Sequence, residues 1–310
     1  MKVHQGASNF RCTNGTVVTI GTFDGVHLGH KAILKRLVEA SKKNKLDSVL
    51  LTFFPHPRMV LQNDADLKLL NTLNEKEILL EAQGIDHLVV HPFTKEFSRL
   101  TAEEFVRDIL VHQLKAKKII IGYDHRFGRN RTANIDNLRE YGIIYGFQVE
   151  EISAKELDDV AISSTKIRNA LNDGDIEMAN TYLGYPYKLQ GVVVRGKGLG
   201  KKLGFPTANL ELEESYKLIP KNGVYVTRAQ IKGQWRFGLT SIGTNPTVGG
   251  TSTTIETYFL KTRFDLYDEY LQLEFLTWIR EEKTFESLDA LKKAIAADEH
   301  FAKEFLDSNG

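Results

Sequence analysis

The chain has 310 residues, 42% hydrophobic and 26% charged, a composition typical of a globular protein that buries a core. Its 41 basic and 40 acidic side chains nearly cancel, which argues against nucleic acid or an anionic membrane as a partner, and its single cysteine, Cys12, excludes an intrachain disulfide and a thiolate metal cluster. No secretory signal or membrane span is recognisable, so we expect a cytoplasmic enzyme.

The first half of the chain alternates between strand-like and helical patterns. Helical periodicity marks residues 74–84 and 101–114, and Thr101 and Glu104 have the spacing of a capping box. Such alternation predicts βαβ units in a mostly parallel sheet, which binds ligands at the carboxyl ends of its strands. The apolar runs that predict the strands are 16–21, 48–54, 87–93, 117–122 and 147–152.

The pattern changes near residue 186. Two helical segments, 163–174 and 175–184, lead into strand-like runs that are separated by short turns, among them 244–250. Successive strands before a final helix predict an antiparallel barrel, so we divide the chain into domains of residues 1–186 and 187–310. The barrel runs are 187–196, 223–231, 234–243, 253–260 and 270–280, and the final helix is predicted over 287–306.

The stretch GTFDGVHLGH follows the first predicted strand of the alternating half. Gly21 and Gly25 permit a sharp turn that brings backbone amides close to a ligand, and a helix that begins directly afterwards has free N–H groups that bind anions. His27 and His30 then share one face of the helix. These features favour a phosphate site, although a tight turn with surface histidines is the alternative; the spacing of a dinucleotide fingerprint is absent.

A second polar cluster occurs in the segment ISSTKIR. Ser163, Ser164 and Thr165 supply hydroxyls, while Lys166 and Arg168 supply positive charge. A capped helix with exposed basic residues is the alternative interpretation. Together with the H-x-G-H stretch, this segment resembles adenylyltransferases of the HxGH nucleotidyltransferase superfamily, in which both elements grip the triphosphate of ATP.

A basic, glycine-rich loop lies between the first two segments of the predicted barrel. It lacks the spacing of a Walker A loop, but its composition suits it to cover phosphates, and a Gly/Lys hairpin loop is the alternative. Pro206 then presents Thr207 and Asn209, whose oxygens are suitable ligands for Mg²⁺ with phosphates. The loop residues that we assign to nucleotide binding are Gly196, Gly198, Gly200 and Lys202.

The predicted strand 253–260 carries a glutamate between apolar residues. Period-two alternation places Ile255 and Thr257 on one face and Glu256 on the other. A desolvated carboxylate has a raised pKa and is suited to take a proton from a hydroxyl nucleophile. An outward-facing strand carboxylate is the alternative.

These motifs, in this order and over nearly the whole chain, resemble the prokaryotic bifunctional riboflavin kinase/FAD synthetase family. FFPHP (53–57), GYDHRFG (122–128), PTANL (206–210) and the tail after Trp278 have counterparts there. The resemblance implies an α/β, Rossmann-like nucleotidyltransferase domain that makes FAD from FMN and ATP with release of pyrophosphate. It implies a six-stranded antiparallel β-barrel with a C-terminal helix that phosphorylates riboflavin to FMN. Two alternatives stay open: a nucleotidyltransferase for another phosphorylated acceptor, and a non-catalytic nucleotide-binding module.

The resemblance also implies roles for individual residues, with ATP as co-substrate, Mg²⁺ as cofactor and flavins as substrates and products. His27 and His30 match the catalytic histidines of the adenylyl site, and Glu256 matches the base of the kinase. Thr207 and Asn209 match residues that bind Mg²⁺ and ATP. Residues matching the ATP phosphate site are Gly21, Phe23, Asp24, Gly25, His27, His30, Ser163, Ser164, Thr165 and Arg168. Residues matching flavin or nucleotide positions are Pro55, His56 and Asp124 in the first domain and Arg280 in the barrel.

The chain departs from the family pattern at a few positions. His125 stands where the family commonly has an aromatic residue, and the segment 129–136 lacks a usual glycine. Asp268 stands where glycine is common. These departures concern the flavin contacts rather than the two reactions.

Overall fold

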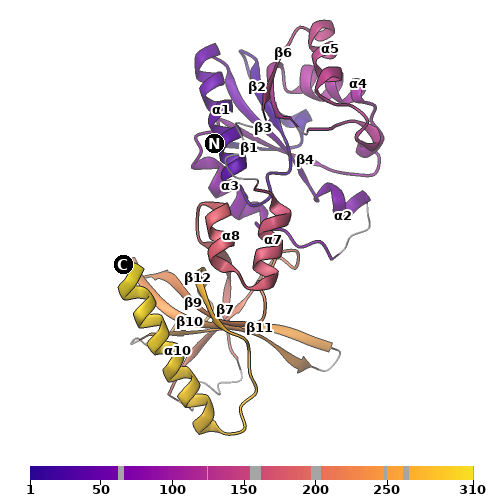
Figure 1. The fold of residues 1–310 in the computed structure, drawn as a ribbon. Coiled ribbons are helices and arrows are strands. Elements are labelled where there is room, and N and C mark those ends of the chain that lie inside the picture. Colours follow the sequence, from indigo (N-terminus) through magenta and orange to yellow (C-terminus); the bar gives the residue numbers. More distant parts are fainter. Residues whose placement is uncertain are drawn as a thin grey trace. The chain divides into compact units, whose positions relative to one another are not determined.

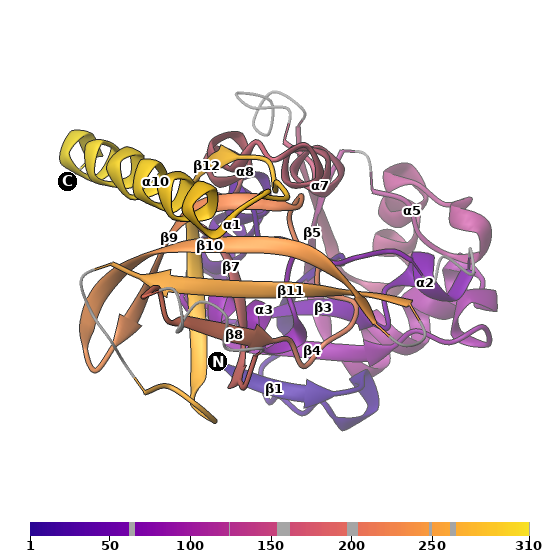
Figure 2. The same ribbon diagram turned by 90° about the horizontal axis from the view of Figure 1, so that it is seen from below.

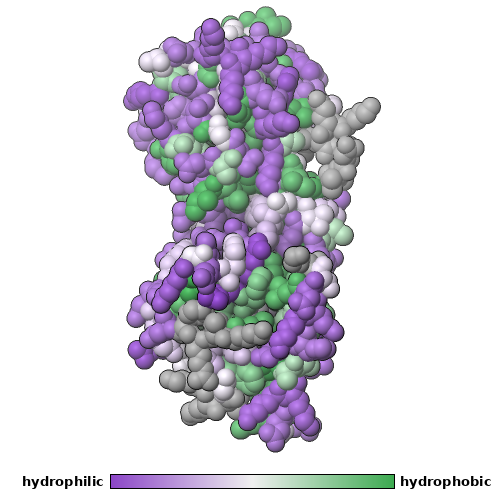
Figure 3. All heavy atoms as spheres, turned by 90° about the vertical axis from the view of Figure 1, so that its left-hand side faces the viewer, coloured by the Kyte–Doolittle hydropathy of each residue, from purple (hydrophilic) through white to green (hydrophobic). Residues whose placement is uncertain are grey.

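The computed structural model describes residues 1–61, 66–123, 125–153, 162–196, 204–247, 250–260 and 265–309, with residues 245–247, 250–252 and 309 described by backbone alone. The chain packs into two compact units, Met1–Ser164 and Thr165–Gly310 (Figure 1). On the face shown in Figure 3, polar residues cover most of the surface and apolar residues appear in smaller patches between them. No helix in the described ranges is long and apolar enough to cross a bilayer.

The first unit is built on a six-stranded sheet with the order β1-β4-β3-β2-β5-β6. Every neighbouring pair is parallel, which confirms the predicted parallel sheet and its five predicted strands. The edge strand β1 was not predicted, because it is short and largely exposed and has no apolar run. The strands are β1 (Lys2–Gln5), β2 (Thr16–Ile20), β3 (Asp47–Phe54), β4 (His87–Pro92), β5 (Ala116–Gly122) and β6 (Gln148–Ile152).

Helices cover both faces of this sheet. Alternate residues of β5 show it, since Ile119 and Ile121 join one apolar cluster and Ile120 joins the other. Helices α1 and α3 pack on the Ile120 side, whereas α5 and the segment after α4 pack on the opposite side (Figure 2). The helices are α1 (Leu28–Asn44), α2 (Pro57–Leu61), α3 (Leu73–Glu81), α4 (Ala102–Glu104), which continues as a π-helix (Phe105–Gln113), and α5 (Ile135–Tyr145).

The helix predicted over 101–114 is present, but most of it is π-helical. Its start is confirmed: Thr101 Oγ1 accepts from the Glu104 amide, and the Glu104 carboxylate accepts from the Thr101 amide, which completes the capping box. At its end the Leu114 amide bonds to the Ile109 carbonyl, five residues back. Hydrophobic periodicity predicts that a helix forms but does not distinguish these two windings.

The strand order reverses next to β2. From β2 the chain adds β3 and β4 on one side and later places β5 on the other side. A parallel sheet opens a crevice at the carboxyl ends of the strands on either side of such a reversal. The ends of β2 and β5 therefore mark the expected ligand position in this unit.

The second unit contains a closed, entirely antiparallel barrel with the order β10-β11-β8-β7-β12-β9, as predicted. The turn predicted over 244–250 is too long, because β10 continues to Thr247, which pairs with Gly250 of β11 in a long hairpin. The polar segment at Thr207 forms strand β8, which the strand pattern did not indicate. The elements are α7 (Ser164–Asp173), α8 (Ile176–Leu183), β7 (Tyr187–Val194), β8 (Thr207–Glu211), β9 (Gly223–Ile231), β10 (Gln234–Thr247), β11 (Gly250–Phe259), β12 (Tyr270–Arg280) and α10 (Leu288–Asn309).

A buried ion pair fastens α10 to the barrel. Arg280 at the end of β12 donates through Nε and Nη2 to the two carboxylate oxygens of Asp298, at 2.9 and 2.7 Å. Asp298 is only 4% exposed, and nearby Ala302 packs against Val226 and Leu239 of the barrel. The bidentate geometry fixes the helix in one position as well as neutralising the buried carboxylate.

Asp298→Ala should therefore loosen α10. Removing one partner of a buried pair costs about 3 kcal/mol, because the remaining charge is left without its partner. We expect a lower melting temperature for the barrel transition in calorimetry. Glu304→Ala, on the exposed side of the same helix, is the matched control and should change stability little. Equal effects of the two substitutions would contradict this role of the ion pair.

Candidate functional sites

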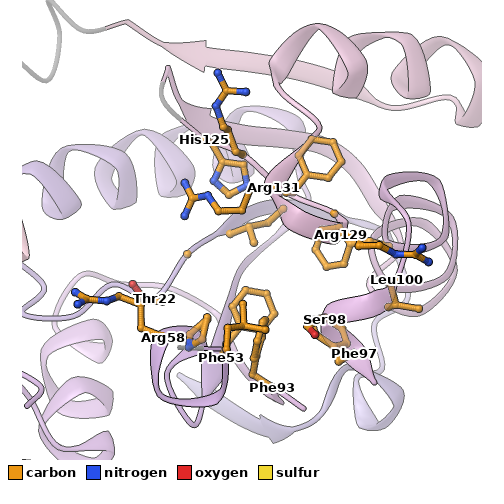
Figure 4. Close-up of a pocket in the computed structure, with 18 of the residues that line it drawn as sticks. Thr22, Phe53, Arg58, Phe93, Phe97, Ser98, Leu100, His125, Arg129 and Arg131 are labelled. Carbon is orange, nitrogen blue, oxygen red and sulfur yellow. The ribbon is translucent and has the colours of Figure 1, made fainter. Parts of the chain in front are cut away.

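A cavity of about 720 Å³ opens at the carboxyl ends of the strands in the first unit (Figure 4). Gly21 after β2, Phe53 of β3, Phe93 after β4 and Gly122 of β5 all contribute to its wall. The GTFDG and GYDHRFG stretches, which lie about a hundred residues apart, therefore border one space, as the sheet topology predicts.

The cavity combines an aromatic wall with positive charge. The rings of Phe53, Phe93 and Phe97 lie 5.6–5.7 Å apart and gather on one side (Figure 4). Within the described ranges, no residue of the lining carries a carboxylate. The arginines of the lining are Arg58, Arg99, Arg126, Arg129 and Arg131. Such a wall suits a planar aromatic ligand that carries an anionic group.

The turn after β2 has a strained backbone. Phe23, Gly25 and Val26 have φ angles of 47°, 89° and 36°, and for a β-branched residue such as Val26 this region is a genuine outlier. Helix α1 begins at Leu28, with His27 as its N-cap. A strained backbone of this kind persists only where contacts with the surrounding structure hold it in place. It is often found at functional sites.

The two histidines stack on each other at the start of α1. The rings of His27 and His30 lie 3.6 Å apart at 17°, and the Phe23 ring lies 4.7 Å from His30, which confirms the shared face. Gly29 makes this possible, because a Cβ atom at that position would lie 3.3 Å from the His27 ring. The glycine of H-x-G-H therefore leaves the His27 ring room that a side chain would crowd.

Both histidines are held neutral. Burial lowers the pKa of His27 to about 4, helped by Lys31 and opposed by Asp24. Burial lowers the pKa of His30 well below its usual value, and the charges of His27 and Lys76 act in the same direction. Because Nδ1 of neutral His27 accepts from the His30 amide at 3.3 Å, its proton resides on Nε2. His27 thus presents an N–H donor.

Asp24 organises the turn from inside the protein. It is 1% exposed, and its carboxylate accepts from the amides of Leu70 at 3.0 Å and Asn71 at 3.4 Å. Its backbone carbonyl accepts from Ser164 Oγ at 2.9 Å. The structure thus joins the serine motif to the histidine motif across 140 residues of sequence.

Other predicted residues of this site lie in varied positions. Exposed Pro55 and half-buried His56 precede α2, whose residues Pro57 and Arg58 line the cavity. Ser163 directly precedes α7, whereas Thr165 and Arg168 lie on α7 in the second unit. Asp124, like Gly198, Gly200 and Lys202 of the glycine-rich loop, lies outside the described residues.

In the barrel, the predicted kinase residues converge on one strand face. Glu256 of β11 lies directly opposite Asn209 of β8, and Thr207 Oγ1 donates to Glu256 Oε2 at 3.1 Å. Gly196 lies against this group, since a Cβ atom there would come within 2.4 Å of Asn209 Nδ2. Pro206 immediately precedes β8. Ile255 and Thr257 are buried, which confirms that the face of Glu256 is opposite to the core.

The positions that depart from the family pattern keep compatible geometry. Asp268 has a φ of 65°, in the left-handed region that glycine favours and aspartate tolerates. The His125 ring lines the cavity and lies nearly parallel to the Phe127 ring, at 6.2 Å and 22°. The imidazole therefore retains an aromatic face at this position.

Sequence reasoning missed the arginine and phenylalanine wall of the cavity. The dense arginines of the run RFGRNR, directly after a strand end, were the available signal. Phe93 and Phe97 gave no comparable signal, because apolar residues near a strand end usually belong to the core. Their common position results from strand order, which single segments do not encode.

The lowered pKa of His27 predicts a pH-dependent stability of the first unit. The unfolded chain binds a proton near pH 6.5 that the folded chain binds only near pH 4, so the free energy of unfolding falls as the pH drops through this window. The effect of this ring is on the order of 3 kcal/mol. In His27→Asn, which retains an N-cap acceptor, urea unfolding should lose less stability between about pH 7 and about pH 5.

Exposed His300 supplies the matched control for that measurement. His300→Asn should keep the pH dependence of the wild type. An unchanged pH dependence in His27→Asn would contradict the lowered pKa of His27.

Comparison with known proteins finds a family match for each half of the chain. A family model for FAD synthetase matches residues 9–166, and one for riboflavin kinase matches residues 183–306. The bifunctional riboflavin kinase/FMN adenylyltransferase of Escherichia coli K12 is 38% identical over 309 residues, which cover 99% of this chain and 98% of that protein. The protein of the same name from Pseudomonas fluorescens is 38% identical over 96% of both chains.

A solved structure shows the same fold over nearly the full length. It is a crystal structure described as a macrolide-efflux protein from Streptococcus pneumoniae, with a TM-score of 0.87 and 30% identity over 97% of this chain and 98% of that chain. The chain belongs to the bifunctional riboflavin kinase/FMN adenylyltransferase family.

Proposed function

We propose that this protein phosphorylates riboflavin to FMN with ATP, and then transfers the adenylyl group of another ATP to FMN, giving FAD and pyrophosphate. The observation that carries the proposal is the presence of two chemically different sites on one chain. The first unit has an anion-binding turn beside an aromatic, arginine-lined cavity, and the barrel has a carboxylate beside hydroxyl and amide oxygens. Riboflavin, FMN, FAD and ATP are the small-molecule partners.

Adenylyl transfer suits the first unit because FMN already carries an anionic phosphate as its nucleophile. The site then needs to hold two anions together and to neutralise charge at the α-phosphorus, and it needs no strong base. The Nε2–H of His27, the His30 ring and the free amides at the start of α1 supply neutral donors. We assign the flavin ring to the wall at Phe53 and Phe97, with the arginines toward its phosphate.

Phosphorylation of riboflavin suits the barrel, because an alcohol nucleophile must lose a proton. We assign Glu256 as the base, with its carboxylate held toward β8 by Thr207 Oγ1. Thr207 and Asn209 present neutral oxygens beside this carboxylate, a donor set that fits Mg²⁺. Bound Mg²⁺ would neutralise charge on the phosphates.

The remaining proposals concern the boundary between the two domains, the role of Arg280, the location of the enzyme and its partners. We place the functional boundary near residue 186, which is supported by family matches that end at 166 and begin at 183. Arg280 would border the kinase flavin site by holding α10 through Asp298. We place the enzyme in the cytoplasm, since both reactions consume ATP, and its balanced charge supports the absence of a nucleic-acid partner.

His30→Ala tests the adenylyl site. FAD formation should fall on the order of 100-fold, equivalent to about 3 kcal/mol, because a preorganised donor to the phosphates is lost. FMN formation should persist, as measured by chromatography of a mixture of riboflavin, ATP and Mg²⁺. His300→Ala is the exposed control and should retain both products. Equal loss of both activities in folded His30→Ala would contradict the two-site proposal.

Glu256→Gln tests the kinase site, and it should affect FMN formation rather than FAD formation. Loss of the general base should lower FMN formation by roughly 100-fold or more, while FAD formation from supplied FMN continues. Exposed Glu213, just after β8, provides the control Glu213→Gln. An unchanged rate of riboflavin phosphorylation in Glu256→Gln would exclude Glu256 as the base.

A further inference from the structure

We propose that Lys76, in the middle of α3, is a positioning residue of the adenylyl-transfer site, and that it acts by holding the strained turn at the carbonyl of Thr22. This inference rests on the proposed adenylyl-transferase function of the first unit. Lys76 lies in the helix predicted over 74–84, no role was predicted for it, and neither reaction described above uses it.

The contact between Lys76 and the turn is direct and buried. Lys76 is 4% exposed, and its Nζ donates to the Thr22 carbonyl at 2.8 Å. The same carbonyl accepts from Thr52 Oγ1 at 3.2 Å, so donors from α3 and β3 both fix it. Thr22 itself lines the cavity and immediately precedes Phe23.

The segment that carries Lys76 holds the turn at a second point. The amides of Leu70 and Asn71 bind the Asp24 carboxylate, two residues beyond Thr22. Between these two anchors lies Phe23, with its positive φ and its ring against His30. Residues 70–76 thus form a two-point clamp, which keeps the His30 ring stacked and the turn in a conformation that it would otherwise leave.

Stability alone gives no reason for a lysine at this position. Burying an ammonium group is costly, and burial lowers the pKa of Lys76, although Asp24 opposes that shift. Thr52 already provides the Thr22 carbonyl with a hydrogen bond, so an apolar side chain would avoid the cost. The charge of Lys76 also reaches His30, whose pKa it helps to lower after burial and His27. Lys76 therefore acts on the proposed phosphate site from inside the protein, through the Thr22 carbonyl and through its charge near His30.

The test compares Lys76→Met with Lys76→Gln in the full-length chain. Met removes the donor to Thr22, whereas the amide of Gln retains one without charge. FAD formation from FMN should have a kcat about 100-fold lower in Lys76→Met, with KM for FMN and ATP changing less, as expected for misplaced groups. Lys76→Gln should recover part of that loss, since its neutral amide, one atom shorter than the lysine side chain, still offers a donor on the side of Thr22.

The barrel supplies an internal control, because FMN formation should be unchanged in both variants. Lys35→Met, at an exposed position on α1, removes the same charge from the same unit and should leave FAD formation unchanged. If the wild type makes no FAD, the proposed function fails. If the wild type makes FAD and folded Lys76→Met makes it equally fast, only the inference about Lys76 fails.

Two further results decide between positioning and a merely structural role. If kcat per folded molecule is unchanged in Lys76→Met and only the amount of folded enzyme falls, the inference is overturned, since Lys76 then only stabilises the fold. If Lys76→Met loses its circular dichroism signal, Thr52→Val replaces it, because it removes the other donor to the same carbonyl with little change in volume. Its kcat for FAD formation should fall about fivefold, and an unchanged kcat would overturn the inference.

Discussion

The hydrogen bonds from the amides of Leu70 and Asn71 to the buried Asp24 carboxylate fix the turn on which the adenylyl site depends. They hold a backbone in which Phe23, Gly25 and Val26 all have positive φ. That backbone allows α1 to start at Leu28 and turns its free amides toward the carboxyl edge of the sheet. The histidine stack, the neutral His27 donor and one wall of the cavity all follow from this local geometry.

In the proposed function, the two units bind the same reagent, the triphosphate of ATP, in different ways. In the first unit, burial keeps the histidines neutral, so they donate hydrogen bonds without adding full charges beside the arginines. In the barrel, the carboxylate of Glu256 is held by Thr207 next to amide and hydroxyl oxygens. An anionic nucleophile requires the first arrangement and a neutral alcohol requires the second. In the proposed function, one chain therefore makes both bonds with separate sets of residues.

Much of the fold could be predicted because periodicity and turn chemistry are local. The five strands from β2 to β6, the helices predicted over 74–84 and 101–114, and the capping box at Thr101 follow from spacing alone. Strand β1 could not be predicted, because its four residues, three of them exposed, carry no apolar pattern. The turn before Gly250 was predicted too long because its glycines and proline are typical of turns, whereas pairing between β10 and β11 extended both strands.

For the candidate sites, the sequence by itself determined which chemical groups are available: the histidine motif with its glycines, the serine motif, and Glu256 in phase opposite to its apolar neighbours. Only the tertiary structure decided which of them meet. It joined Ser164 to Asp24, gathered arginines and phenylalanines from separate loops around one cavity, and buried Lys76 beneath the turn. The physical reason is that residue type and spacing are properties of a segment, whereas burial, strain and contact across the sheet depend on how distant segments pack.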